Sequence, residues 1–187
     1  MDVEWRPFYL YFDTPPEGRE LPEHVKQARA QGSEERLRQM AESYGMKFQS
    51  VQRIYNTRLA HEATEYARQH GNPARINSPI QRDERGKGNE FHKVVFRKVY
   101  ADGQDPSQWE VLRAAAEEVG LDADAMQREV ENETYTAAVV DQVRWAYQIG
   151  VTGVPTYVIN NRYGIVGAQP YEVFKSALEQ IANQKEE

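Results

Sequence analysis

The order of the predicted elements constrains the fold more than any other feature. A strand-like segment, Val3–Phe12, comes near one end, and Thr156–Asn160 with Arg162–Val166 form a predicted hairpin near the other, followed by a helix from Pro170. The residues between these two parts are dominated by helical patterns. Strands so far apart share one sheet only if the helices between them form an insertion. The order therefore predicts an α/β layer with an inserted all-helical subdomain.

The helical segments are indicated by apolar spacing and by the residues at their ends. We expect helices over 23–30, 33–44, 56–70, 91–99, 105–119, from 122 onward and over 134–149. Ser33, Asn56, Asp105 and Asp122 are the predicted N-terminal residues, and the segment Gly71–Asn89 is predicted to be a flexible loop. The division that follows is a layer of residues 1–22 and 150–187 and an insertion of residues 23–149.

Charge and hydropathy exclude several classes of partner. The net charge of −6 comes from 29 acidic and 23 basic residues that are spread along the chain, so no nucleic-acid partner is expected. No apolar run approaches the ~20 residues of a membrane span, and the first residues lack the pattern of a signal peptide. We therefore expect a cytoplasmic protein with no membrane partner.

The sequence contains no cysteine, which excludes disulfides and thiol nucleophiles within these 187 residues. The four histidines, at positions 24, 61, 70 and 92, do not have the spacing of metal ligands. No metal or other cofactor is expected, and we expect no catalytic residue among the side chains present.

A proline stands at the head of the predicted hairpin. The sequence reads Gly-Val-Thr-Gly-Val-Pro-Thr-Tyr-Val-Ile from Gly150 to Ile159, and proline gives a sheet no N–H donor. A cis bond between Val154 and Pro155 would turn the chain sharply and leave the backbone of the preceding residue facing outward. We expect this geometry here.

These residues resemble the DsbA-like thioredoxin-fold family, in its FrnE-type subgroup. The run from Gly150 to Phe174 resembles the family's cis-proline loop and the entry to its last helix. The segments "VEWRPFYL" with "PPEG", "NTRLAHEATEYARQHG", and "EEVGL" with "DADAM" resemble further parts in the same order. The resemblance covers nearly the whole chain and implies a thioredoxin-like α/β fold with a helical insertion.

The resemblance also implies a site. Family members hold an extended thiol or disulfide partner against the cis-proline loop, so Thr152, Val154 and Pro155 are predicted substrate contacts, and Asn56 and His61 are predicted to line the same groove. Family members carry a strand and a helix with Cys-x-x-Cys before the edge strand, where the helix N-terminus lowers the pKa of the first thiol. Both are missing from this sequence. The chain is therefore expected to be a shortened thiol–disulfide oxidoreductase that is not redox active by itself.

Two alternatives remain open. One is a glutathione-dependent isomerase or transferase of the hydroxychromene-carboxylate isomerase type, which shares the fold and the asparagine-bearing helix, with a small thiol as substrate. The other is a peptide-binding module without chemistry. Because a sheet that lacks its central strand exposes unpaired backbone groups, we also expect a homodimer, with exchange of Val3–Phe12 between the two copies as one arrangement.

Overall fold

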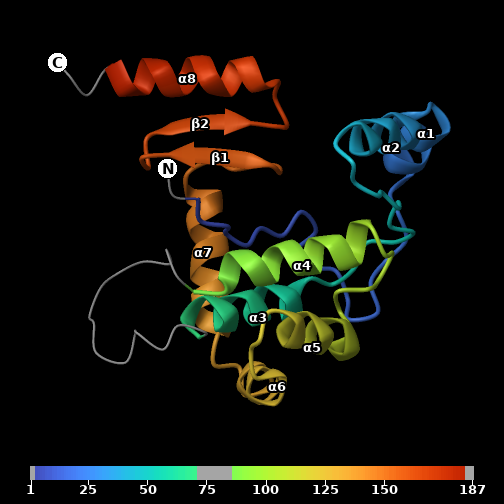
Figure 1. The fold of residues 1–187 in the computed structure, drawn as a ribbon, viewed down its shortest axis with the longest axis vertical. Helices are drawn as coiled ribbons and strands as arrows, with labels where there is room; N and C mark the ends of the chain where they lie inside the picture. The colour runs from blue at the N-terminus through green and yellow to red at the C-terminus, as the bar shows by residue number, and fades with distance from the viewer. Residues whose placement is uncertain (1–2, 71–85, 184–187) are drawn as a thin grey trace. The chain divides into compact units, whose positions relative to one another are not determined.

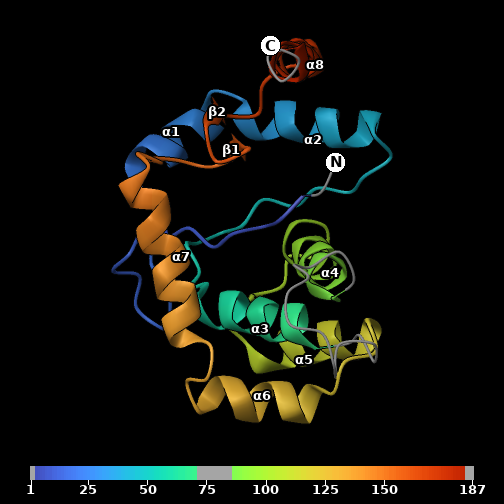
Figure 2. The ribbon, with the colours of Figure 1, turned by 90° about the vertical axis from the view of Figure 1, so that its left-hand side faces the viewer.

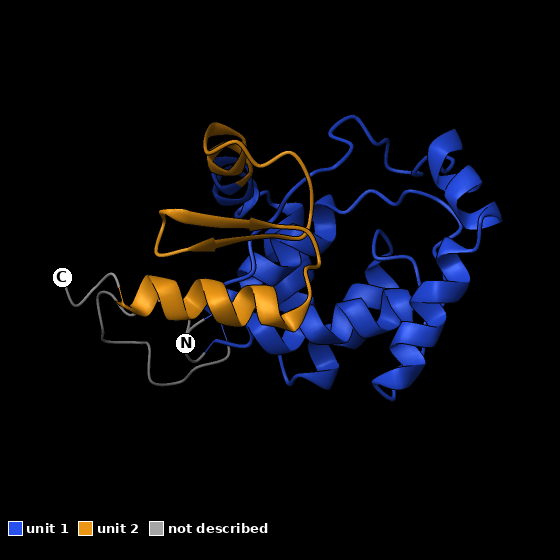
Figure 3. Ribbon diagram, turned by 90° about the horizontal axis from the view of Figure 1, so that it is seen from above, with its two compact units in different colours: residues 1–142 blue, residues 143–187 orange. Residues whose placement is uncertain are grey.

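The structure is a computed structural model that describes residues 3–70 and 86–183. The chain forms two compact units, Met1–Gln142 and Val143–Glu187 (Figure 3). In chain order, the elements are α1 (Glu23–Ala30), α2 (Ser33–Ser43), α3 (Arg58–Gln69), α4 (Gly88–Tyr100), α5 (Trp109–Glu118), α6 (Ala123–Glu131), α7 (Thr136–Gln148), β1 (Thr156–Ile159), β2 (Tyr163–Val166) and α8 (Tyr171–Asn183) (Figure 1). Most of the predicted loop Gly71–Asn89 lies outside the described residues.

The core of the first unit is built from α3, α4, α5 and α6. Helix α3 packs against α4 and α6, and α5 packs against the same two helices (Figure 2). Their facing sides carry many alanines, which allow close approach, together with a few large side chains. The fully buried members of this cluster are Ala63, Ala67, Phe91, Leu112, Ala115, Ala116 and Met126. Burial of this apolar surface is the main source of stability for the unit.

The helix ends follow local chemistry, with three corrections. The predicted N-cap of α3 at Asn56 is one residue too early, because Thr57 holds that position and the helix begins at Arg58. Asp122 caps α6 as predicted, since its carboxylate accepts a hydrogen bond of 2.9 Å from the N–H of Ala125. The predicted start of α5 at Asp105 is wrong, because that carboxylate binds the N–H of Ser107 in a turn and Gln108 remains extended, with ψ of 129°. Ser33 is the first residue of α2 and not its cap. Positive-φ Gly32 holds that position.

The prediction of a strand at Val3–Phe12 is wrong for the described residues. Residues 3–9 have no assigned secondary structure, and a bend and a turn follow. A strand needs a neighbouring strand to pair with its backbone, and none of the described segments supplies one here. Side chains of α3 and α4 bind backbone carbonyls of this segment instead.

Helices α1 and α2 pack against each other as a helical hairpin. Neither helix contains a buried residue. The predicted apolar face of α2 is present, but Leu37, Met40 and Tyr44 are all exposed. The hairpin therefore adds little to the core of the first unit.

The second unit contains the predicted hairpin and last helix. Strands β1 and β2 pair antiparallel, from Thr156 opposite Val166 to Ile159 opposite Tyr163. Asn160 and Asn161 have φ of 54° and 55° in the three-residue turn between the strands, a left-handed conformation that asparagine tolerates better than most residues. Helix α8 runs alongside the hairpin (Figure 3), and the ring of its Phe174 lies edge-on to Tyr157 at 4.7 Å.

Candidate functional site

Three of the predicted site residues, Thr152, Val154 and Pro155, lie in the loop between α7 and β1 of the second unit. Gly150, with φ of +83°, ends the helix before this loop. The peptide bond between Val154 and Pro155 is cis. The carbonyl of Pro155 accepts a hydrogen bond of 2.8 Å from the N–H of Gly167, which follows β2. The loop is thus held to the open end of the hairpin.

The loop presents unpaired backbone groups. The hydroxyl of Thr156 donates to the carbonyl of Gly153 at 2.7 Å, and this hydrogen bond stabilises the turn within the loop. Within residues 143–183, the backbone N–H and C=O groups of Thr152 and Val154 make no hydrogen bond. The side chain of Val154 is also exposed, at 52%. An extended peptide can pair with such groups as an added strand, with its side chains setting the specificity.

Asn56 lies just before α3 in the first unit, and its amide is used within the chain. Its Oδ1 accepts a hydrogen bond of 3.0 Å from the N–H of Arg58 at the start of the helix. Its Nδ2 donates to the carbonyl of Thr14 at 2.7 Å. Asn56 therefore ties the start of α3 to the segment before α1, and its role in ligand binding stays a prediction.

His61 lies in the first turns of α3. The ring of Tyr9 stands edge-on to it at 5.4 Å between centroids. Burial, with a smaller contribution from nearby His92, lowers the pKa of His61 to about 4, so the imidazole is neutral at pH 7. Its Nε2 is buried and has no hydrogen-bond partner among the described residues. His61 is thus part of an aromatic contact with the segment that contains Tyr9.

The predicted site residues fall into two groups. Thr152, Val154 and Pro155 share one loop of the second unit. Asn56 and His61 lie at the start of α3 in the first unit. The loop offers backbone donors and acceptors to a ligand, whereas the polar atoms of Asn56 are bonded inside the chain. The loop is therefore the stronger candidate for contact with a partner.

Glu62, a residue that no sequence motif marks, is fully buried on α3. Its Oε1 accepts hydrogen bonds from the hydroxyl of Thr136 at 3.0 Å and from Arg58 at 3.4 Å. Burial raises the pKa of Glu62, while the contacts with Thr136 and Arg58 oppose the rise. The helical spacing of Glu62 from apolar Leu59, Ala63 and Tyr66 could have predicted its burial, since this spacing places the carboxylate on the buried face of the helix.

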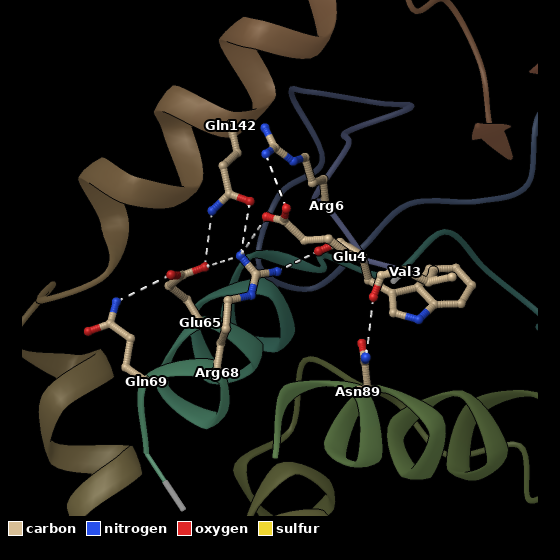
Figure 4. Close-up of polar contacts among 9 residues, drawn as sticks. Val3, Glu4, Arg6, Glu65, Arg68, Gln69, Asn89 and Gln142 are labelled. Carbon is tan, nitrogen blue, oxygen red and sulfur yellow. Dashed lines mark hydrogen bonds and ion pairs between the residues drawn. The ribbon is translucent and has the colours of Figure 1, made fainter. Parts of the chain in front are cut away.

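A second polar network surrounds Arg68 (Figure 4). Its Nη1 donates to Glu65 at 2.8 Å and to Gln142 at 3.2 Å, and the amide of Gln142 donates back to Glu65 at 3.0 Å. Its Nη2 donates to the carbonyl of Trp5 at 2.5 Å, and the carboxylate of Glu4 lies 3.7 Å from Nη1. The sequence shows only the i,i+3 spacing of Glu65 and Arg68, because the other partners are far away in the chain.

Residues 3–70 and 86–183 contain neither a cluster of metal-ligating side chains nor a membrane-spanning helix. No three histidine or acidic side chains gather there in a way that would hold a metal ion. The helices of these residues are also too short or too polar to cross a lipid bilayer.

Comparison with known proteins gives the family. The profile of the DSBA-like thioredoxin domain matches residues 1–179, so the chain belongs to this family. Its fold is accordingly the thioredoxin-like α/β fold of DsbA, mostly helical with a small sheet, as the resemblance of the sequence predicted. A curated relative, the uncharacterized protein YwbO of Bacillus subtilis (strain 168), is 29% identical over 181 residues, which is 95% of this chain and 81% of YwbO.

Two solved structures are similar in fold. A probable DsbA oxidoreductase from Streptomyces coelicolor is 28% identical with a TM-score of 0.64, over 82% of this chain and 61% of that protein. The chain therefore spans less than two thirds of that neighbour. A 2-hydroxychromene-2-carboxylate isomerase is 20% identical with a TM-score of 0.69, over 97% of this chain and 82% of the isomerase. This second likeness concerns the fold alone.

Proposed function

We propose that the chain is part of a protein thiol–disulfide oxidoreductase and that its loop Thr152–Pro155 binds the partner polypeptide. The observation that carries this proposal is the open backbone of Thr152 and Val154 beside an exposed Val154 side chain. Donors and acceptors in this arrangement fit an extended peptide, which can pair with them as an added strand. Membership of the DsbA-like family and similarity to a probable DsbA oxidoreductase support the reaction class.

The chemistry needs thiols that these 187 residues do not contain. In thiol–disulfide exchange, a thiolate attacks one sulfur of a disulfide, forms a mixed disulfide and releases the other sulfur as a thiolate. In our proposal both reacting thiols of the enzyme come from residues outside this sequence, and the loop orients the partner. By itself the chain binds the partner without oxidising or reducing it.

Binding of an extended, cysteine-containing peptide without aromatic residues tests the role of the loop. A peptide N-methylated at the amide that pairs with the carbonyl of Val154 should bind about fivefold more weakly, since it loses one hydrogen bond. A peptide N-methylated at the next amide, which points to the opposite side of an extended chain, is the matched control. Equal affinity for both peptides, or no binding, would contradict the proposal without requiring any change to the protein.

The two alternatives make different demands. An isomerase of the hydroxychromene-carboxylate type would use Asn56 near its ligand, but both polar ends of that amide are bonded to Arg58 and Thr14. A binding module without chemistry would share the loop and differ in having no thiols anywhere in the native protein. The oxidoreductase is therefore the function we put forward, and the thiol content of the native protein separates it from the binding module.

A further inference from the structure

The fold compensates only part of the charge that Glu62 carries when it is ionised. The side chain is 1% exposed, and its Oε2 is buried without a hydrogen-bond partner among the described residues. Its Oε1 accepts from the hydroxyl of Thr136 at 3.0 Å and from Arg58 at 3.4 Å. The side chain of Arg58 is 48% exposed, so water screens much of its attraction for the carboxylate. An ionised Glu62 therefore leaves one charged oxygen inside the protein without a partner.

The groups that act on Glu62 come from several parts of the first unit. Burial raises the pKa of Glu62 and the nearby carboxylate of Glu133 raises it further, whereas Thr136 and Arg58 oppose the rise. The phenol of Tyr9 is also close, since its own pKa is raised by burial and then by the charge of Glu62, so this phenol is neutral at pH 7. Glu62 therefore binds a proton more tightly in the folded protein than in the unfolded chain.

The start of α7 depends on polar contacts with α3. Helix α7 packs less extensively against α3, α4, α5 and α6 than these helices pack against one another. Thr136 in its first turn donates to Glu62, and Gln142 donates to Glu65 at 3.0 Å (Figure 4). Glu133, in the turn between α6 and α7, has φ of 58°, a left-handed conformation that few residues other than glycine adopt. The first turn of α7 is thus the part beside Glu62 that opens most easily.

We propose that Glu62 makes the attachment of α7 to α3 depend on pH. With a proton on Oε2, the carboxyl group is neutral and stays buried, and its Oε1 still accepts from Thr136. Without that proton, the turn at Glu133 and the first turn of α7 open, so that water reaches the carboxylate. The open form gains population as the pH rises. This inference is independent of the function proposed for the loop, because it involves neither the loop nor a thiol.

The test follows amide hydrogen exchange in the full chain between pH 5 and pH 8, corrected for the intrinsic effect of pH on exchange. The N–H groups of Thr136 and Val139, which donate to the carbonyls of Glu133 and Tyr135, report on the first turn of α7. Their protection should fall about fivefold as the pH rises, while the amides of α3, α4 and α5 keep theirs. The carbon-13 resonance of the Glu62 carboxyl group should change over the same pH range.

Three variants assign the effect to Glu62. Glu62→Gln keeps a neutral side chain of similar shape and should leave the first turn of α7 protected at every pH in this range. Glu133→Gln removes a repulsion, so Glu62 should lose its proton at lower pH and the fall in protection should be smaller. Glu131→Gln is the matched control, since it makes the same change of charge at an exposed position of α6, and it should change neither quantity.

The unaltered chain supplies a readout that does not depend on the folding of any variant. Protection of Thr136 and Val139 that stays constant from pH 5 to pH 8 would overturn the proposal. An equal loss of protection over α3, α4 and α5 would also overturn it, because the whole unit and not this turn would then be opening. The same holds if the pH dependence persists in Glu62→Gln, or if Glu131→Gln acts as strongly as Glu133→Gln.

Discussion

Truncation of one buried ring on α4 tests whether α3, α4, α5 and α6 form the stabilising core of the first unit. Phe91 has 0% exposure and belongs to this core, whereas Phe96 on the same helix is 47% exposed. Phe91→Ala should lower the free energy of unfolding by about 3–5 kcal/mol, through lost burial and the cavity left behind. Phe96→Ala removes contacts with His92 and Tyr100 and should lower the free energy of unfolding by about 1 kcal/mol.

The pair is matched because both positions lie inside α4, so the helix propensities of phenylalanine and alanine contribute equally. Native-state hydrogen exchange of α3–α6 measures the free energy of opening in the first unit even if the two units unfold separately. Thermal melting should show a loss of roughly 10 °C for Phe91→Ala. Equal losses for the two variants, or a larger loss for Phe96→Ala, would refute the assignment of the core.

Three further predictions concern buried charge, pH and backbone strain. Since burial raises the pKa of Glu62, Glu62→Gln should stabilise the protein by about 1 kcal/mol at pH 7, and urea titrations should show the gain vanishing below pH 4.5. His61 and His92 are neutral in the folded protein, with a pKa of about 4. Acidification from pH 6.5 to 4 should therefore lower the free energy of unfolding by up to about 3 kcal/mol for each histidine. Replacing both with phenylalanine should flatten that dependence in urea titrations. Gly18→Ala places Cβ 2.5 Å from a backbone oxygen and should lower Tm more than Gly45→Ala, which meets nothing within 4 Å at a similar φ.

Features set by neighbouring residues were predictable from the sequence. The asparagine pair at 160 and 161 and the glycine at 45 adopt the positive φ that their positions require. Asp122 caps α6 within three residues of itself. Each of these depends on side chains and backbone within a few residues, so the sequence carries the whole signal.

Features that depend on distant partners were less predictable. Val3–Phe12 has the composition of a strand, but a strand exists only where another segment pairs with it. The burial of Glu62 depends on Thr136, which is far away in sequence. For the site, the sequence pointed to Val154 and Pro155 through a local motif, whereas the hydrogen bonds of Arg68 and Asn89 to residues 3–12 became visible only in the fold. Those two side chains bind carbonyls more than sixty residues away.

The thiol content of the native protein tests the central claim most directly. The measurement is the intact mass of the protein isolated from its source cells, before and after alkylation under reducing conditions. Our account predicts a mass above that of these 187 residues and a gain of two alkyl groups, as thiol–disulfide exchange requires. A mass equal to that of these residues, with no alkylation, would contradict the oxidoreductase and leave a polypeptide-binding protein without redox chemistry.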